Sequence, residues 1–378
     1  MSTTLDDLIL LASRAPSAHN TQPWSARVVT ETSVEVSVVP SRTLPAGDPS
    51  FRDVVLGLGA WVECFAIGAS ELGFNVSVEA LPALERLEEL PIVGRADPSS
   101  PVLRVSLEAH RVGVQGARVE ARAFSADDVR QRGVFRGRLA GHPETWDDLV
   151  DVDLPPWLTV RRLDDRAMAY LSRLGIAFTA SRPSVAKELL SWLRLDPKHP
   201  RYRLDGMTDV MLGTPRPLAR LAARATRRRH LRDPLLAVAG VIGGASESLE
   251  RARSLRPLDL SLAESSPDSP THLVLVVNAR IAALDDAPRV TALMDSSIGI
   301  AEPDVLDAGR VLQRLWLHAH TRGLAVSPHS ELIDSPLAHG LLRKRLSLGR
   351  SDVALAVFSV GVPTGDVPRS PRLTDVVS

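Results

Sequence analysis

The chain has 378 residues, of which 44% are apolar and 24% are charged, and its 45 basic and 45 acidic side chains cancel at pH 7. A chain of zero net charge with only 4% aromatic residues is not the pattern of a nucleic-acid-binding protein, and this apolar content excludes intrinsic disorder over most of the length. The single cysteine, Cys64, excludes a disulfide framework and a cysteine metal cluster. Any binding preference must therefore come from local groups of side chains.

Neither the first residues nor the apolar stretches of the sequence indicate export or a membrane span. The first residues include Asp6 and Asp7, where a secretion signal carries positive charge. The longest apolar stretch, 235–244, is far shorter than the roughly 18 residues that cross a bilayer. We therefore expect a cytoplasmic protein that binds neither membranes nor nucleic acid.

The first third of the chain predicts two helices and two pairs of strands. Apolar residues at helical spacing indicate the helices, and alternating apolar residues indicate the strands. In chain order we expect helix 5–14, strands 25–30 and 33–39, helix 48–73, strand 74–80, a loop or short helix at 81–100, and strand 102–108. The helix at 48–73 is apolar on nearly all sides, with Asp48 as its cap, and so belongs at the centre of the molecule.

The remaining two thirds of the chain repeat this mixture of helices and strands with longer polar segments between them. We expect a polar and then helical region at 121–149, strand 157–163, helix 184–195, a segment of weak periodicity at 197–268, strand 272–277, helix 304–322 and strand 353–361. The chain is therefore expected to have an α+β fold.

The two long helices share a pattern. Gly59 and Gly309 each begin an apolar stretch that ends at a glycine fourteen residues later, Gly73 and Gly323, and a strand-like run follows each. A glycine after a helix of four turns is common, so coincidence is one explanation. We interpret the echo as two divergent copies of one α+β unit, residues 1–120 and 121–378, with an insertion at about 197–268 in the second.

A polar segment between the first helix and the first strand has side chains suited to ligand binding. Residues 14–24 read Arg-Ala-Pro-Ser-Ala-His-Asn-Thr-Gln-Pro-Trp, and the two prolines restrict the backbone. Ser17, Asn20 and Gln22 offer donors and acceptors that suit a flat heteroaromatic ring with an amide-like edge. The alternative is a loop in which Ser17 caps a turn and Asn20 satisfies backbone groups.

The run from Ala15 to Trp24 resembles the signature loop of nitroreductase-like flavoproteins, and the whole chain is similar to their Acg-like branch. The resemblance implies a nitroreductase-like fold in which two divergent copies form a pseudo-dimer within one chain, with FMN between them. It implies that Pro16, Ser17, Asn20 and Gln22 bind the cofactor, with Ser17 and Asn20 at its isoalloxazine or ribityl part.

Arginines of the second copy resemble the phosphate anchor of the family. Residues 132–136 read Arg-Gly-Val-Phe-Arg, similar to the family pattern Arg-x-Ser/Thr-x-Arg, so Arg132 and Arg136 are expected at the phosphate, although Val134 replaces the hydroxyl residue. Arg369 and Arg372 resemble the closing segment of that site. Guanidinium groups suit a phosphate, and the alternatives are a solvated helix start and a solvated tail.

A third segment, 327–331, resembles the loop whose backbone N–H meets flavin N5, so Pro328, His329 and Ser330 are expected at the cofactor. These segments of the second copy complete one site together with the loop of the first copy. A second site, with the roles of the two copies exchanged, would need such a loop in the second copy. The nearest counterpart there is Ala-Ser-Arg-Pro-Ser at 180–184, so this second site lacks the loop. One chain therefore holds both halves of a site, and a monomer can be functional.

Two other patterns are set aside, and one is left open. Gly57-Leu58-Gly59 lacks the third glycine of a dinucleotide-binding turn, and His318 and His320 point to different faces of a helix, so neither a Rossmann site nor a metal site is expected. The arginines between 216 and 232 form either a solvated helix face or a lid over the flavin that attracts an anionic nicotinamide cofactor or substrate.

The resemblance implies an FMN-dependent oxidoreductase that uses NADH or NADPH to reduce a small nitro, quinone or enone-type acceptor. The flavin then carries the redox chemistry, and no catalytic side chain is required. One alternative is an FMN storage or sequestration protein without turnover, in which the insertion covers the ring. The other is a flavin-dependent dehydrogenase of a natural-product intermediate.

Overall fold

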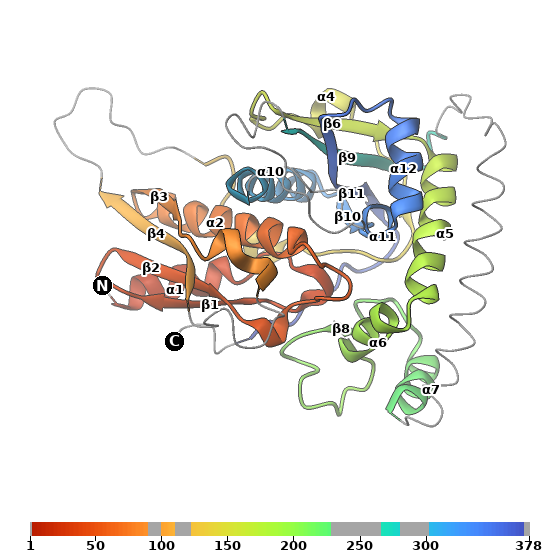
Figure 1. Ribbon diagram of the computed structural model, residues 1–378, viewed down its shortest axis with the longest axis horizontal. Helices are drawn as coiled ribbons and strands as arrows, with labels where there is room; N and C mark the ends of the chain where they lie inside the picture. The colour runs from red at the N-terminus through yellow and green to blue at the C-terminus, as the bar shows by residue number, and fades with distance from the viewer. Residues whose placement is uncertain (1, 90–99, 110–121, 228–265, 280–301, 374–378) are drawn as a thin grey trace.

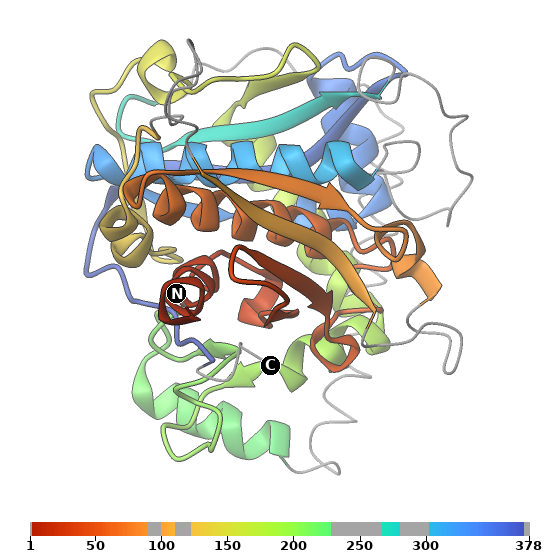
Figure 2. The same ribbon diagram turned by 90° about the vertical axis from the view of Figure 1, so that its left-hand side faces the viewer.

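The computed structural model describes residues 2–89, 100–109, 122–227, 266–279 and 302–373. Two antiparallel sheets lie on either side of a central pair of long helices, α2 and α10, which run side by side in both views (Figures 1 and 2). The mixed helix and strand content expected from the sequence is confirmed.

The first half of the chain builds the first sheet and the helices beside it. Its elements are α1 (Ser2–Ala12), the 3-10 helix η1 (Ala18–Asn20), β1 (Trp24–Val28), β2 (Ser33–Val38), the 3-10 helix η2 (Pro40–Arg42), α2 (Arg52–Glu71), β3 (Phe74–Ala80), the 3-10 helix η3 (Leu84–Glu89) and β4 (Pro101–Ala109). The strand order is β1-β2-β4-β3, with every neighbouring pair antiparallel.

The second half of the chain builds the second sheet, the helices around it and a separate two-stranded sheet. Its elements are α3 (Ala126–Gln131), β5 (Leu139–Ala140), α4 (Trp146–Leu149), β6 (Leu158–Leu163), α5 (Asp165–Ser181), α6 (Pro183–Ser191), β7 (Leu193–Arg194), β8 (Met207–Thr208), α7 (Arg216–Arg227), β9 (Thr271–Asn278), α10 (Glu302–Thr321), β10 (Ala325–Pro328), α11 (Glu331–Asp334), α12 (Pro336–Arg345) and β11 (Asp352–Pro363). The strand order is β10-β11-β9-β6, and β5 pairs with β11.

The second sheet is covered on both faces, and its central strand β9 is apolar from Leu273 to Val277. In β9, Leu273 and Leu275 join the large core around α2 and α10, whereas Val274 and Val276 pack with α5, α11 and α12 on the opposite face. Side chains alternate between the faces of a strand, so a continuous apolar run is what a sheet buried on both faces requires. Figure 1 shows α5 and α12 on that outer face.

The central helices approach each other at their glycines. A Cβ on Gly59 would lie 1.9 Å from the carbonyl oxygen of Leu306, and a Cβ on Gly309 would lie 2.2 Å from that of Leu56. Only glycine allows the two backbones to come this close. Gly73 and Gly323, which follow these helices, both have positive φ, as expected for glycines that end helices.

A buried carboxylate also joins the central helices. Glu63 of α2 is fully buried, and its carboxylate pairs with Arg122 at 3.0 Å and with two arginines of α10, Arg310 at 3.1 Å and Arg314 at 3.6 Å. Removing one partner of such a group leaves an uncompensated buried charge, so the network fixes how the two helices pair.

Helix α2 is the one helix of the described segments that is long and apolar enough to span a membrane by length and composition, and 89% of its most apolar window is buried inside the molecule. That burial is typical of the core helix of a globular protein. The longest apolar stretch expected from the sequence, 235–244, lies outside the described residues, as do 90–99 of the expected loop at 81–100.

Two expectations on boundaries differ from the structure. Helix α2 begins at Arg52, and Asp48 lies before it, where its carboxylate accepts the N–H of Val54 at 3.2 Å. The helix expected at 184–195 ends at Ser191, because the following residues form β7. The segment 197–268, in which the sequence shows weak periodicity, is described only in part, since residues 228–265 lie outside the described residues. The described remainder contains β8 and α7.

Candidate functional site

The loop between α1 and β1 has an unusual backbone. His19, Asn20 and Gln22 have φ values of 49°, 56° and 53°, in the left-handed region that residues other than glycine rarely adopt. The hydroxyl of Ser17 accepts the N–H of Gln22 at 2.9 Å and closes the turn. Strained backbone of this kind persists only where surrounding contacts hold it, and it is concentrated at functional sites.

Two buried amide side chains of this loop hold segments that are distant in sequence. Gln22 donates from Nε2 to the carbonyl oxygen of Leu204 at 2.9 Å and accepts at Oε1 from the N–H of Leu373 at 2.9 Å. Asn20 donates from Nδ2 to the carbonyl oxygens of Pro371 at 3.1 Å and Gly206 at 3.3 Å. The loop thus brings together the first half, the insertion and the C-terminal segment.

Three arginines from different parts of the chain meet at the start of this loop, and we call Arg14, Arg132 and Arg372 the arginine cluster. Arg372 donates to the carbonyl oxygen of Arg14 at 2.8 Å and to Oδ1 of Asn20 at 2.7 Å. Arg132 donates to the same carbonyl oxygen of Arg14 at 3.2 Å, and its guanidinium lies 5.5 Å from the ring centre of Trp316.

No ion pair among the described residues compensates the positive charge of the cluster. Burial lowers the pKa of Arg132 to about 10, and burial and the charge of Arg14 lower the pKa of Arg372. The ion pairs of the described residues include none of the three arginines. The buried Nε atoms of Arg132 and Arg372 have no hydrogen-bond partner. Unfilled donors and concentrated positive charge fit an anion.

Arg369 lies at the exposed edge of the cluster. Burial and then the charge of Arg369 lower the pKa of Arg14, and Arg14 donates to the neighbouring carbonyl oxygen of Ser370 at 3.4 Å. Three of the four arginines expected at a phosphate, Arg132, Arg369 and Arg372, are therefore brought together.

Arg136, the fourth, lies apart from the cluster. Phe135 donates its N–H to the carbonyl oxygen of Val326 at 2.9 Å, which aligns this segment with β10. Burial lowers the pKa of Arg136 against the opposing charge of Glu331, and the charge of Arg136 contributes, after burial, to a pKa of about 4 for His19. Arg136 therefore lies between the loop and the segment 327–331.

The segment 327–331 has a free backbone donor at Ser330. Pro328 has no N–H, and His329 donates its N–H to the carbonyl oxygen of Val357 at 2.8 Å. Among the described residues the N–H of Ser330 has no acceptor. Ser330 can therefore offer a backbone hydrogen bond to a ligand.

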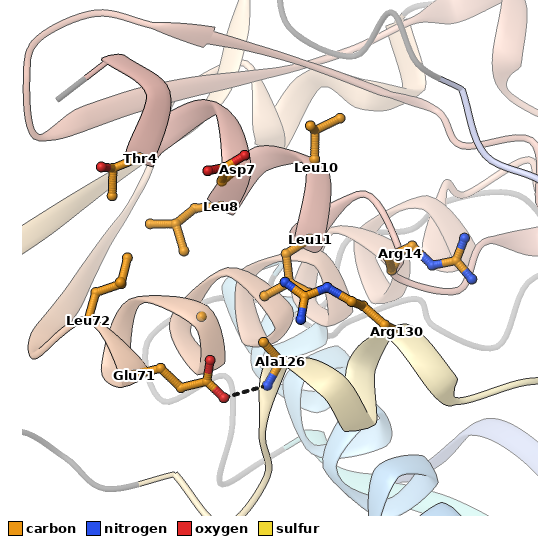
Figure 3. Close-up of a pocket in the computed structure, with 11 residues that line it drawn as sticks. Thr4, Asp7, Leu8, Leu10, Leu11, Arg14, Glu71, Leu72, Ala126 and Arg130 are labelled. Atoms are coloured by element: carbon orange, nitrogen blue, oxygen red, sulfur yellow. Dashed lines mark hydrogen bonds between the residues drawn. The ribbon is translucent and has the colours of Figure 1, made fainter.

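A separate open pocket of about 630 Å³ lies between α1, the end of α2 and α3 (Figure 3). Arg130 points among the lining side chains, Arg14 points away from them, and the hydrogen bond from the N–H of Ala126 to Glu71 lies at the edge of the pocket. None of the residues expected at a flavin lines this pocket. It adjoins the arginine cluster only through Arg14.

Arg14 was not among the expected site residues. Its position between the first helix and the polar loop is a signal in the sequence, but its closeness to Arg132 and Arg372 depends on tertiary structure. The same holds for Leu204 and Gly206, which nothing in the sequence connects with the loop.

Comparisons with curated proteins give short but significant matches, and no protein-family model matches the chain. It is 37% identical over 79 residues to the putative NAD(P)H nitroreductase Rv3131 of Mycobacterium tuberculosis, which is 21% of this chain and 23% of that protein. It is 36% identical over 74 residues to the putative NAD(P)H nitroreductase acg of the same organism, 20% of this chain and 22% of that protein. The chain thus matches less than a quarter of the length of these curated relatives.

Among solved structures, a putative nitroreductase from Anabaena variabilis ATCC 29413 covers 96% of this chain and 88% of its own, with 11% identity and a TM-score of 0.40. The FMN and NADPH-dependent nitroreductase NfnB from Sphigopyxis sp. strain HMH covers 65% of this chain and 93% of its own, with 15% identity and a TM-score of 0.29.

Proposed function

We propose that this chain, a relative of nitroreductase-like proteins with Acg among them, is an FMN-dependent oxidoreductase that uses NADH or NADPH to reduce a small nitro, quinone or enone-type acceptor. The observation that carries the proposal is the arginine cluster beside the loop of residues 15–24. It supplies buried, unfilled donors where the resemblance implies the flavin phosphate.

The residues fit the phosphate part of FMN directly. Arg132 and Arg372 are pre-positioned by the carbonyl oxygen of Arg14, and their free Nε atoms suit the oxygens of a phosphate. FMN, when bound, supplies the chemistry by accepting a hydride from NADH or NADPH and passing it to the acceptor.

Binding of the isoalloxazine ring requires a rearrangement around the loop. The amides of Asn20 and Gln22 are engaged by segments 204–206 and 371–373, so a ring that takes these amides must displace those segments. The N–H of Ser330 and the side chain of Arg136 are available as they stand. We therefore expect Ser330 to contribute the backbone donor at flavin N5.

We further propose that the chain is a pseudo-dimer of two unequal nitroreductase-like halves, 1–120 and 121–378. The close contact of the central helices supports this, because Gly59 meets Leu306 as Gly309 meets Leu56, with the helices exchanged. Such reciprocity is the mark of a two-fold contact between like units. In this arrangement one chain is a complete monomer with one site.

A second candidate function, FMN storage without turnover, is favoured by one observation. Leu204 and Gly206 belong to the insertion at about 197–268, and both accept hydrogen bonds from the loop. A segment that covers the loop in this way restricts access of a nicotinamide to a ring bound there.

The absorption spectrum of the purified protein, before and after incubation with FMN, tests the proposal. An oxidised flavin spectrum that is bleached by NADH or NADPH without oxygen supports the oxidoreductase. A flavin that is retained but stays oxidised with both reductants supports storage. A protein that remains colourless after incubation with FMN contradicts both.

A further inference from the structure

A continuous chain of polar side chains crosses the second sheet. Nδ1 of His272 lies 2.7 Å from Oγ of Ser359, which lies 2.9 Å from Nε2 of His329, and Nδ1 of His329 lies 3.2 Å from Oε1 of Glu331. At the other end, Nε2 of His272 lies 3.5 Å from Oδ1 of Asp165, close enough for an ion pair once His272 is protonated but without a hydrogen bond. We call these five residues the histidine–serine chain.

The register of the sheet creates this arrangement. Ser359 of β11 is directly opposite His272 of β9 and Ser327 of β10, and His329, two residues after Ser327, lies on the same face, diagonally across from Ser359. Directly opposed residues place their side chains on the same face. Ser359 is 3% exposed and His272 is 8% exposed, so the centre of the chain is shielded from water.

Every internal bond of this chain can reverse its direction. With Glu331 ionised, Nδ1–H of His329 donates to the carboxylate, the hydroxyl of Ser359 donates to Nε2 of His329, and Nδ1–H of His272 donates to Ser359. A proton that arrives at Nε2 of His272 allows each bond to reverse, which leaves the proton on Glu331. The two arrangements differ by one proton, by the tautomer of each histidine and by the direction of the Ser359 hydroxyl, which return to their first arrangement before a second proton passes.

The surrounding charges suit this behaviour. Burial lowers the pKa of His272 to about 4 against the opposing effect of Asp165, with smaller effects of His329, Asp164 and Arg162. Although burial acts to raise it, the hydrogen bond and charge of His329 hold the pKa of Glu331 below its usual value, and Ser172 also donates to Glu331 at 2.8 Å. At neutral pH His272 is uncharged and Glu331 is a carboxylate.

We propose that the histidine–serine chain is a proton relay that supplies the flavin site through Glu331, an inference that rests on the proposed function. Glu331 follows Ser330, the residue with the free backbone donor, and its charge acts on Arg136 next to the loop. Asp165, whose side chain is 30% exposed, connects the other end to solvent.

The relay supplies the proton that the proposed reaction consumes. A quinone acceptor takes a hydride from the reduced flavin and one proton from Glu331, and the product is a hydroquinone. Glu331 is ionised at rest, and the proton it passes on enters His272 from solvent at the Asp165 end and moves through Ser359 and His329 to Glu331. One proton enters and one leaves in each turnover, and the flavin returns to its oxidised form.

The same distances also resemble a Ser-His-Glu catalytic triad, with Ser359 as nucleophile. That interpretation fails on access, because Ser359 is buried within β11 and its hydroxyl is shared with a second histidine, His272. A nucleophilic serine must contact its substrate, whereas a serine in a proton relay needs only hydrogen bonds to the neighbour on each side.

The first test uses the protein without cofactor. In ¹⁵N spectra of the imidazoles over a pH series, we expect His272 and His329 to titrate as a coupled pair in the wild type, to titrate independently in Ser359→Ala, and to remain coupled in Ser359→Thr, which keeps the hydroxyl. His142→Gln is the control, because His142 bonds only the adjacent Thr271, at 3.0 Å. Independent titration in the wild type would overturn the relay.

The second test uses the FMN-loaded protein with a quinone acceptor, in single turnovers in H₂O and D₂O. Ser359→Ala should slow the oxidation of reduced flavin by about 100-fold, the lower end of what general acid catalysis contributes. FMN retention and reduction by NADPH should be unchanged, and Ser359→Thr should restore the rate. If Ser359→Ala does not fold, His272→Asn cuts the same chain at its outer end.

The outcomes separate the relay from the proposed function. Retained FMN, normal reduction by NADPH and an unchanged rate of flavin oxidation in Ser359→Ala would overturn the relay and leave the oxidoreductase standing. Failure of the wild type to bind FMN would overturn both.

Discussion

A buried guanidinium is stable only where hydrogen bonds or an opposite charge replace the water it has lost. In the arginine cluster that replacement is incomplete, because backbone carbonyl oxygens take part of the donors and two Nε atoms have no partner. A protein that maintains such a cluster without bound anion does so at a cost in stability. An anion that binds to the arginine cluster should therefore stabilise the folded protein.

Replacing Arg132 by methionine tests this at a single residue. Arg132→Met keeps the apolar stem and removes the charge, so it should weaken FMN binding by about 10- to 100-fold, since hydrogen bonds to charged groups contribute roughly 1.5–3 kcal/mol. Fluorescence titration of FMN gives the dissociation constant. Arg130→Met is the matched control, because Arg130 is an exposed arginine of α3 that lines the other pocket. Equal losses in both variants would place the phosphate elsewhere.

His19 provides a second prediction, on pH. Burial lowers its pKa from 6.5 to about 4, with a smaller effect of Arg136. Its folded pKa lies below its unfolded value, so the unfolded chain binds the proton more strongly, and stability falls as the pH drops from 6.5 towards 4. His19→Asn removes the titration and suits the positive φ. Between pH 7 and pH 4.5 the wild type should lose about 2 kcal/mol more than the variant in urea unfolding. Parallel losses would contradict this.

At the scale of elements, the central helices depend on two glycines. Gly59→Ala places a methyl group against the carbonyl oxygen of Leu306, at 1.9 Å, and should lower the free energy of unfolding by roughly 3 kcal/mol. Gly340→Ala is the control, because Gly340 lies in the interior of α12 with nothing within 4 Å of an added Cβ. That variant should gain about 0.5–1 kcal/mol from helix propensity. Urea unfolding measures both, and a neutral Gly59→Ala would mean that the helices can separate without cost.

The long helices and most strands could be predicted because their apolar patterns are long and uninterrupted. Gly59 and Gly309 already indicated a relation between the two helices, although only the structure places them in contact. Helix α5 was missed even though Asp164 caps it, accepting the N–H of Ala167 at 2.9 Å. Its apolar stripe is diluted by arginines and small residues, so periodicity alone did not reveal it.

The resemblance to nitroreductase-like proteins, Acg included, is confirmed by the curated relatives, and their names agree with an NAD(P)H-dependent enzyme. The residue roles at the flavin remain predictions. The loop, Arg132 and Arg372 could be selected from the sequence because their types match a family pattern. Arg14 and the histidine–serine chain could not, because each depends on contacts between residues thirty or more positions apart along the chain, and the histidine–serine chain also depends on the register of β9, β10 and β11.

At the scale of the whole molecule, the C-terminal segment connects the two halves. After β11 the chain leaves the second sheet and returns to the loop of the first half, where Arg372 bonds Asn20 and the N–H of Leu373 bonds Gln22. A subunit that supplies both sides of its own site has no need of a partner to complete it. The amides of Asn20 and Gln22 are thus satisfied within one chain.

The oligomeric state and flavin content together test this arrangement. We expect light scattering coupled to size-exclusion chromatography to give the mass of one chain, and flavin absorbance after release of the cofactor to give one FMN per chain. The reason is that only one of the two halves carries the Ser17, Asn20 and Gln22 loop, and only the other carries Arg132. A chain shortened after Pro368, which loses Arg372 and the bond from Leu373, should remain folded, because these residues lie outside both sheets, but it should retain much less FMN. A dimer with two FMN per chain, or full retention in the shortened chain, would contradict a single site built from both halves.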